Sequence, residues 1–212
     1  MRLCITVFLL SYLITNAQST FSKEVEDIAL KYDTLYDATR ESIVFTGSSS
    51  IRVWKDLQAR FPDYQIINSG FGGSQATDLL QFTDKLVLNY KPKKVFIYEG
   101  DNDIQSKKRP KEIIHTLTEI RDLIFSDNPK TEIIFISAKP SISRWKLRRK
   151  YKRLNRKIEK MTRTDIRLQY IDVWKPMLNG RKVKEDIFAK DGLHMNSKGY
   201  DIWYSVLEDY VN

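Results

Sequence analysis

The sequence predicts an α/β fold of three layers (α/β/α), in which a five-stranded parallel sheet lies between two layers of helices. Short apolar runs alternate with longer amphipathic stretches along the chain. Most of the short runs are continuously apolar, as strands buried on both faces must be. No internal repeat, low-complexity segment or Pro/Gly-rich linker interrupts this alternation, so we expect a single domain.

The expected elements follow one another in a regular order. The strands are rich in Ile, Val, Phe and Tyr and cover Ile43–Phe45, Tyr64–Ile67, Val95–Tyr98, Ile133–Ile136 and Leu168–Val173. Helical patterns precede the first strand and follow the strands, at Glu24–Tyr36, Ile51–Phe61, Thr77–Asn89, Pro110–Ser126, Arg144–Lys160 and Ser197–Val211. Pro110 suits a first helical turn, and Asn196 or Ser197 is the expected N-cap of the last helix.

The first residues predict a secretory signal peptide. A basic start, Met1-Arg2, precedes an almost wholly apolar run to Ile14, and small residues up to Ala17 offer a cleavage site. The apolar run is too short to span a bilayer comfortably, although an uncleaved anchor or a buried N-terminal helix are alternatives. We therefore expect residues 1–17 to be removed, residues 18–212 to form the mature domain, and that domain to be secreted or periplasmic.

The cysteine count restricts the chemistry of the mature domain. Cys4 is the only cysteine, so a chain cleaved near Ala17 would contain none. Disulfide bonds, thiol catalysis and cysteine-ligated metals would then be excluded.

The positive charge is concentrated in one segment. The formal net charge is +9, and Arg144–Lys160 alone holds ten Lys or Arg residues against the single Glu159. Such a segment could bind nucleic acid, anionic glycan or anionic lipid, or it could be the solvated face of a helix. The second interpretation is favoured, because an apolar stripe recurs at helical spacing. The stripe is Leu147, Tyr151, Leu154, Ile158 and Met161. No aromatic residues interleave on the basic face, so we expect no nucleic-acid partner.

Functional residues are expected in the loops that follow the strands, because open parallel sheets bind ligands at the carboxyl ends of their strands. Gly47–Ser50 follows the first strand and leads into a helix, whose N-terminal N–H groups favour a developing oxyanion. Taken alone, this segment is better explained as an ordinary serine N-cap.

Asn68–Ser74 follows the second strand and holds three glycines, which let the backbone approach a ligand closely. It lacks the third small residue of a dinucleotide-binding loop and could also be a flexible turn.

The loop after the third strand holds an amide between two carboxylates. Asn102 could donate a side-chain N–H to an oxyanion, which the ionised Asp101 and Asp103 cannot do. The two aspartates also suggest a metal site with oxygen ligands, but no further ligand cluster of the required number is evident.

His194 is the better placed of the two histidines to act as a base. His115 lies off the apolar stripe of a helix, and we expect it to be an exposed side chain without a role. His194 lies in a loop before the last helix, and Asp191 stands three residues earlier. A serine nucleophile needs a base of near-neutral pKa and a group that holds the tautomer of that base, and this pair supplies both.

Together these four segments resemble the SGNH hydrolases, also called the GDSL family of esterases and lipases. Phe45–Ser49 resembles the block with the nucleophile, and Asn68–Gly73 the block that provides a glycine N–H. Gly100–Asp103 matches the block that provides an asparagine, and Asp191–His194 matches the closing Asp-x-x-His. The order of the blocks is the family's order, and they span nearly the whole mature domain.

The resemblance implies the flavodoxin-like SGNH hydrolase fold for the mature domain and a role for each matched residue. Ser49 would be the nucleophile, His194 the general base and then acid, and Asp191 the carboxylate that orients it. The oxyanion hole would consist of the N–H groups of Ser49 and Gly73 and the side chain of Asn102.

One position departs from the family pattern. Ser48 stands where the family usually has the aspartate of Gly-Asp-Ser. That aspartate does not transfer protons, so we expect activity to survive. The departure leaves Ser48 and Ser50 as competing nucleophiles, with Ser49 preferred by its alignment to the motif.

We therefore expect a serine ester hydrolase that uses no metal or organic cofactor. The family acts on acetylated sugars, short-chain esters, lysophospholipids and thioesters. Short loops and the lack of a lid insertion favour a small acyl group, with deacetylation of a glycan as the preferred reaction. Hydrolysis of a phospholipid or lysophospholipid, with membrane contact through the basic segment, is one alternative. A non-catalytic binding module is the other, supported only by Ser48. Arg144 follows the fourth strand closely, and we expect it to border the cleft and bind substrate.

Overall fold

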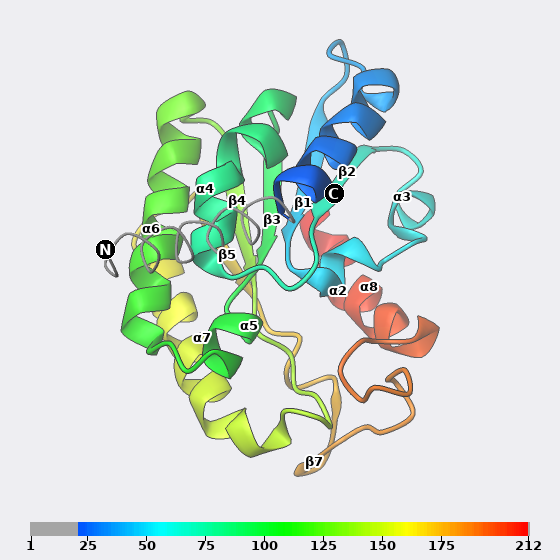
Figure 1. Ribbon diagram of the computed structural model, residues 1–212, viewed down its shortest axis with the longest axis vertical. Helices are drawn as coiled ribbons and strands as arrows, with labels where there is room; N and C mark the ends of the chain where they lie inside the picture. The colour runs from blue at the N-terminus through cyan, green and yellow to red at the C-terminus, as the bar shows by residue number, and fades with distance from the viewer. Residues whose placement is uncertain (1–20, 212) are drawn as a thin grey trace, which may run out of the picture.

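The computed structural model describes residues 21–211, and five parallel strands form its central sheet (Figure 1). The strands lie in the order β2-β1-β3-β4-β5, which is the flavodoxin-like order. Their bounds are β1 Ser42–Gly47, β2 Gln65–Gly70, β3 Lys94–Tyr98, β4 Glu132–Ile136 and β5 Leu168–Ile171. The predicted fold class and all five predicted strands are therefore confirmed.

Helices cover both faces of the sheet (Figure 1). The helix of residues 21–35, α4 (Ala76–Leu86), α6 (Pro110–Asp127) and α7 (Arg148–Thr162) pack on one face. The other face is covered by α2 (Ser49–Arg52), α3 (Leu57–Arg60) and α8 (Ser197–Val211). Because side chains alternate along a strand, Val44 and Val95 enter the first core while Phe45 and Phe96 enter the second. This burial on both sides explains why the strands are continuously apolar.

The predicted helix over Ile51–Phe61 is wrong as a single element, because α2 and α3 are two separate short helices. The side-chain amide of Asn68, on the neighbouring strand β2, donates hydrogen bonds to the carbonyls of Ile51 at 2.9 Å and Trp54 at 3.4 Å. A continuous helix would use these carbonyls for its own i→i+4 bonds. The competing amide therefore favours a break after α2.

Several short elements were not expected from the sequence. They are α5 (Asp101–Gln105), the 3₁₀ helices η1 (Leu88–Tyr90) and η2 (Trp145–Leu147), and a two-stranded antiparallel hairpin of β6 (Leu178–Asn179) and β7 (Lys182–Val183). The last helix has the predicted bounds, and Oδ1 of Asn196 accepts the N–H of Gly199, as expected of an N-cap.

The predicted signal peptide and its cleavage near Ala17 lie outside the described residues. Within residues 21–211, no helix combines the length and apolar character needed to cross a membrane.

Candidate active site

Ser49 is the first residue of α2, and only Ser48 separates it from the end of strand β1. The turn at Gly47 has φ +117°, and a Cβ there would lie 2.1 Å from the carbonyl oxygen of Tyr98 on β3. Only glycine fits this close approach. The N–H of Ser48 donates to the same Tyr98 carbonyl, so the turn is tied to the end of β3. Because β1 has β2 on one side and β3 on the other, Ser49 stands where the strand order reverses.

The three adjacent serines differ in accessibility. Ser48 and Ser50 are each only 2% exposed, whereas Ser49 is half-buried. The hydroxyl of Ser49 lies 2.9 Å from Nε2 of His194. The geometry therefore favours Ser49 over its two neighbours as the nucleophile.

His194 and Asp191 lie together in the loop before α8. Oδ1 of Asp191 accepts the backbone N–H groups of Leu193 and His194, and its Oδ2 lies 2.5 Å from Nδ1 of His194. Burial alone would raise the pKa of Asp191, but these hydrogen bonds lower that pKa to about 2. An ionised carboxylate can only accept, so Nδ1 of His194 carries the proton and Nε2 is left to accept from Ser49.

The segments that follow β2 and β3 meet beside Ser49. The strand register aligns Gly47 with Gly70 and with Tyr98, and the N–H of Phe71 donates to the Gly47 carbonyl at 2.8 Å. Nδ2 of Asn102 donates to the carbonyl of Ser74 at 2.8 Å, so the amide and the glycine loop are joined.

The backbone N–H groups of Gly73 and Ser49 are available to a ligand. Gly73 has φ +78°, and a Cβ there would meet nothing within 4 Å, so this backbone faces open space. Among the described residues, neither the N–H of Gly73 nor that of Ser49 has a hydrogen-bond partner. These are the two N–H groups that the sequence predicts for an oxyanion hole.

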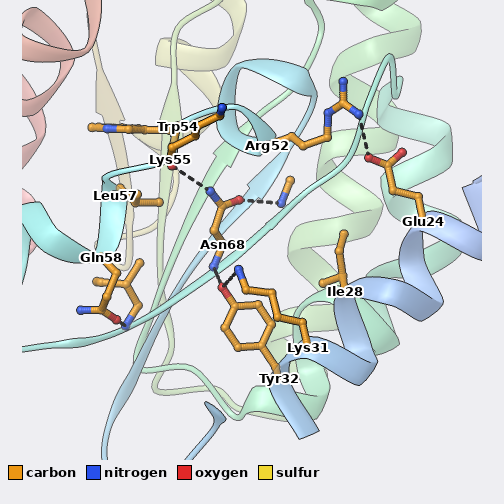
Figure 2. A pocket seen from close by; sticks show the side chains of 12 residues that line it. Glu24, Ile28, Lys31, Tyr32, Arg52, Trp54, Lys55, Leu57, Gln58 and Asn68 are labelled. Atoms are coloured by element: carbon orange, nitrogen blue, oxygen red, sulfur yellow. Dashed lines mark hydrogen bonds and ion pairs between the residues drawn. The ribbon is translucent and has the colours of Figure 1, made fainter. Parts of the chain in front are cut away.

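The glycine loop is held by a residue that sequence reasoning missed. The carboxylate of Glu24 accepts the N–H of Gly72 with both oxygens, at 3.0 and 3.1 Å, and pairs with Arg52 at 3.3 Å. Figure 2 shows this ion pair beside a pocket of about 370 Å³, with Asn68 between Trp54 and Tyr32. Glu24 lies near the start of the described chain and far from any motif, so no local signal pointed to it.

Arg144 lies at the site but not as expected. Its Nη1 donates to Asp101 at 2.6 Å and its Nη2 donates to Oδ1 of Asn102 at 3.0 Å, and the side chain is only 14% exposed. The guanidinium therefore contacts the predicted oxyanion amide. Substrate binding by Arg144 stays a prediction that no contact in the structure tests.

The two aspartates beside Asn102 have other partners than a metal. Asp101 contacts Arg144, Tyr98 and Tyr151, and Asp103 accepts the N–H of Ala76 and pairs with Lys108. Within residues 21–211, no group of three or more His, Cys, Asp or Glu side chains could hold a metal ion. His115 is exposed, as predicted, and its Nε2 lies 3.9 Å from Glu119 on the same helix, α6.

The basic segment forms α7 and its flanking turn. Tyr151, Leu154, Ile158 and Met161 are buried and Leu147 is half-buried, as the periodicity predicts. The basic side chains from Arg149 onward are exposed, whereas Arg144 is turned inward. Aromatic residues from other elements nevertheless border the basic face. A groove of about 850 Å³ is lined by Arg149, Lys152, Arg153 and Arg156 together with Tyr170, Trp174 and Tyr210. Lys152 Nζ lies 5.7 Å from the ring centroid of Trp174. Sequence reasoning missed these rings because they are distant from α7 in the chain.

Comparison with known proteins identifies the family. The model of the GDSL-like Lipase/Acylhydrolase family matches residues 31–202, which is most of the chain. No curated protein matches the chain.

Solved structures share the fold at low sequence identity. A protein from Streptococcus pneumonia, provisionally described as a platelet activating factor, is 24% identical with a TM-score of 0.80 over 95% of this chain and 99% of its own. A GDSL-like lipase from Bacteroides thetaiotaomicron VPI-5482 is 21% identical with a TM-score of 0.72 over 86% of this chain and 96% of its own. A carbohydrate esterase family 3 from Talaromyces cellulolyticus is 18% identical with a TM-score of 0.64 over 81% of this chain and 96% of its own.

The family match spans every loop that carries the predicted site residues, from Ser49 to His194. The fold likeness and the family match agree with each other. The chain is therefore a carboxylic ester hydrolase and belongs to the GDSL-like lipase/acylhydrolase family.

Proposed function

We propose that the protein cleaves short acyl esters through an acyl-enzyme formed on Ser49. The contact series from Asp191 through His194 to Ser49 carries this proposal, because it links a carboxylate, an imidazole and a hydroxyl at hydrogen-bond distances. A hydroxyl is a weak nucleophile until a base takes its proton, and this series supplies the base and orients it.

In the first half of the reaction, Oγ of Ser49 attacks the ester carbonyl carbon while Nε2 of His194 takes the hydroxyl proton. The carbonyl oxygen becomes an oxyanion, which accepts hydrogen bonds from the N–H groups of Ser49 and Gly73 and from Nδ2 of Asn102. When the tetrahedral intermediate collapses, the bond to the alcohol oxygen breaks. His194 gives its proton to that oxygen, and the alcohol leaves.

In the second half, His194 takes a proton from water, and the resulting hydroxide oxygen attacks the acyl carbon on Ser49. Collapse breaks the bond between that carbon and Oγ, and His194 returns the proton to the serine. The products are a carboxylic acid and the free enzyme. Asp191 stays ionised throughout and stabilises the imidazolium that forms twice in each cycle.

The site best suits a substrate that carries a small acyl group on an accessible alcohol. The side chains of His194 and Asp191 are 30% and 47% exposed, so the catalytic groups lie near the surface. Such a site offers little apolar area to a long acyl chain. The fold likeness to a carbohydrate esterase further supports deacetylation of a glycan as the reaction.

Hydrolysis of a lysophospholipid is the second candidate, and the basic groove beside α7 is the observation that favours it. A panel of p-nitrophenyl esters from acetate to decanoate separates the two candidates, followed by acetylated xylan and a lysophospholipid. We expect kcat/KM to fall as the acyl chain lengthens, with Ser49→Ala inactive on every ester. A rise of kcat/KM with chain length would favour the lipid. No hydrolysis of any ester by a folded protein would favour the non-catalytic binding module.

Export is part of the proposal. A glycan substrate outside the cytoplasm suits a chain whose first 17 residues have the pattern of a signal peptide. N-terminal sequencing of the protein from the culture medium or periplasm should find a start near Gln18, and a start at Met1 would contradict export with cleavage.

A further inference from the structure

The side-chain amide of Asn102 is held at both of its ends. Nδ2 donates to the carbonyl of Ser74 at 2.8 Å, and Oδ1 accepts from Nη2 of Arg144 at 3.0 Å. A flipped amide would place N–H against guanidinium N–H at one end and oxygen against carbonyl oxygen at the other. The two contacts therefore specify one orientation, in which the second N–H of Nδ2 is left for an oxyanion.

Arg144 is itself held by a buried carboxylate. Nη1 donates to Oδ1 of Asp101, whose side chain is 6% exposed and also accepts the hydroxyls of Tyr151 at 2.8 Å and Tyr98 at 3.1 Å. Burial alone would raise the pKa of Asp101, but Lys139 and Arg144 lower it, so the carboxylate stays ionised at neutral pH. The guanidinium thus uses one nitrogen for a buried ion pair and another for Asn102.

A second cation extends this network to the histidine loop. Lys139 is fully buried, and its Nζ lies 3.7 Å from Oδ2 of Asp101 and donates to the carbonyl of Leu193 at 2.8 Å. Leu193 directly precedes His194. Asp101 therefore lies between Arg144, which holds the oxyanion amide, and Lys139, which holds the loop of the catalytic base.

We propose that Arg144 is a positioning residue that acts on catalysis through Asn102; this inference rests on the proposed ester hydrolysis. Its charge-assisted bond to Oδ1 fixes the amide and polarises it, which makes the Nδ2 N–H a stronger donor to the oxyanion. This role differs from the substrate contact that the sequence suggests. It predicts an effect on kcat, because an oxyanion forms only as the reaction proceeds.

A double-mutant cycle on p-nitrophenyl acetate tests the coupling between the two residues. We expect Arg144→Gln to lower kcat roughly 10- to 100-fold with KM changed less than about threefold, since a misaligned donor costs no more than a deleted one. In an Asn102→Ala background, the same Arg144→Gln change should lower kcat less than about threefold, because the amide through which it acts is gone. Lys150→Gln, on the exposed side of α7 and outside the basic groove, is the matched control and should leave kcat unchanged.

Two outcomes of this cycle would overturn the inference. A rise in KM with unchanged kcat would make Arg144 a substrate-binding residue. An equal fold-loss in both backgrounds would show that it acts independently of Asn102. Inactive wild-type protein, or full activity in Ser49→Ala, would instead refute the proposed hydrolysis, so the two failures are distinguishable.

A second variant and a spectroscopic measurement keep the test decisive if Arg144→Gln folds poorly. Arg144→Lys keeps the positive charge beside Asp101, so the variant should fold. A single ammonium cannot bond Asp101 and Asn102 together as the planar guanidinium does, so kcat should be at least about fivefold lower than that of wild type. The side-chain amide signals of Asn102, assigned by their loss in Asn102→Ala, should shift in the ¹H–¹⁵N spectrum of Arg144→Lys. Wild-type kcat together with unshifted amide signals would contradict the positioning role.

Discussion

Ser49 and His194 are separated by 145 residues in the chain, yet Oγ of Ser49 lies 2.9 Å from Nε2 of His194. The C-terminal helix secures this proximity. The hydroxyl of Tyr200, on α8, donates to the carbonyl of Ser50 at 2.8 Å, and its ring stacks on Trp54 with centroids 5.0 Å apart. The loop with His194 is thereby held against the turn with Ser49 at its C-terminal end.

This proximity predicts that Ser49 is the single nucleophile. A fluorophosphonate probe should label the wild-type protein once, and Ser49→Ala should abolish the labelling while the circular dichroism spectrum is unchanged. Ser48→Ala and Ser50→Ala are the neighbouring controls and should still be labelled, because both side chains are buried. Labelling that persists in Ser49→Ala and is lost in either control would show that the nucleophile is assigned to the wrong serine.

Removal of the Asn102 side-chain amide, the proposed donor to the oxyanion, should affect turnover more than substrate binding. We expect Asn102→Ala to lower kcat for p-nitrophenyl acetate by roughly 10²–10³-fold with little change in KM, because an oxyanion donor acts chiefly in the transition state. Steady-state kinetics measure this directly. An altered KM with unchanged kcat would make Asn102 a ground-state binding residue.

The strands and the site loops could be predicted from the sequence because their signals are local. Continuous apolar runs mark strands buried on both faces, and Ser49, Asn102 and His194 each lie within a short motif. The break after α2 could not be predicted, since the Asn68 amide that favours it comes from strand β2.

The contacts of Arg144 were also beyond the sequence. The closeness of Arg144 to the fourth strand predicts that it borders the cleft, but its ion-pair partner Asp101 is 43 residues away and no local pattern predicts that contact. Only the fold shows that Arg144, just before η2, points inward while Arg149 faces solvent. Such long-range pairing of polar side chains leaves no periodicity to detect.

A buried carboxyl near the site should make stability depend on pH. Burial raises the pKa of Glu99 well above its usual range, and the nearby Asp103 raises it further. The folded protein therefore keeps Glu99 protonated at pH values where the unfolded chain loses that proton, so this group destabilises the fold as pH rises above about 4.3. Glu99→Gln replaces the carboxyl with an amide that does not titrate and whose oxygen can still accept the hydrogen bond from the Ser74 hydroxyl.

Glu99→Gln should therefore be more stable than wild type at pH 8 and similar to it near pH 4. The contribution of Glu99 can change by at most about 1.4 kcal/mol per pH unit. Urea unfolding at a series of pH values measures the difference. A stability gain that is independent of pH would contradict the protonated state of Glu99.

The buried Lys139 should contribute to folding. Lys139→Met keeps the length of the side chain but leaves the Leu193 carbonyl without its donor and removes one cation from Asp101. We expect a loss of about 3 kcal/mol in the free energy of unfolding, as is typical when one partner of a buried ion pair is removed. Urea unfolding of Lys139→Met and of the exposed control Lys190→Met checks this. A loss below about 1 kcal/mol would show that the buried ammonium does not stabilise the fold.

The exposed basic face of α7 should affect surface attraction and not catalysis. A quadruple change to glutamine removes the cations that line the groove, namely Arg149, Lys152, Arg153 and Arg156. These side chains have no ion-pair partner among the described residues and lie beyond Arg144 along the helix. Turnover of p-nitrophenyl acetate, a small neutral ester, should therefore stay within about twofold of wild type. Binding to dextran sulfate or to anionic vesicles should weaken, and the difference should shrink as salt rises, because exposed charges are screened over about 10 Å at 0.1 M salt.

The location of these charges is tested by a control with the same change in net charge elsewhere. Four exposed lysines outside the groove serve for it: Lys23, Lys111, Lys130 and Lys182. If the groove concentrates the attraction, the α7 variant should lose several times more affinity for the polyanion than the control. Equal losses would show that net charge alone drives binding. A collapse of small-ester turnover in a folded α7 variant would instead place this face of the helix in the catalytic machinery.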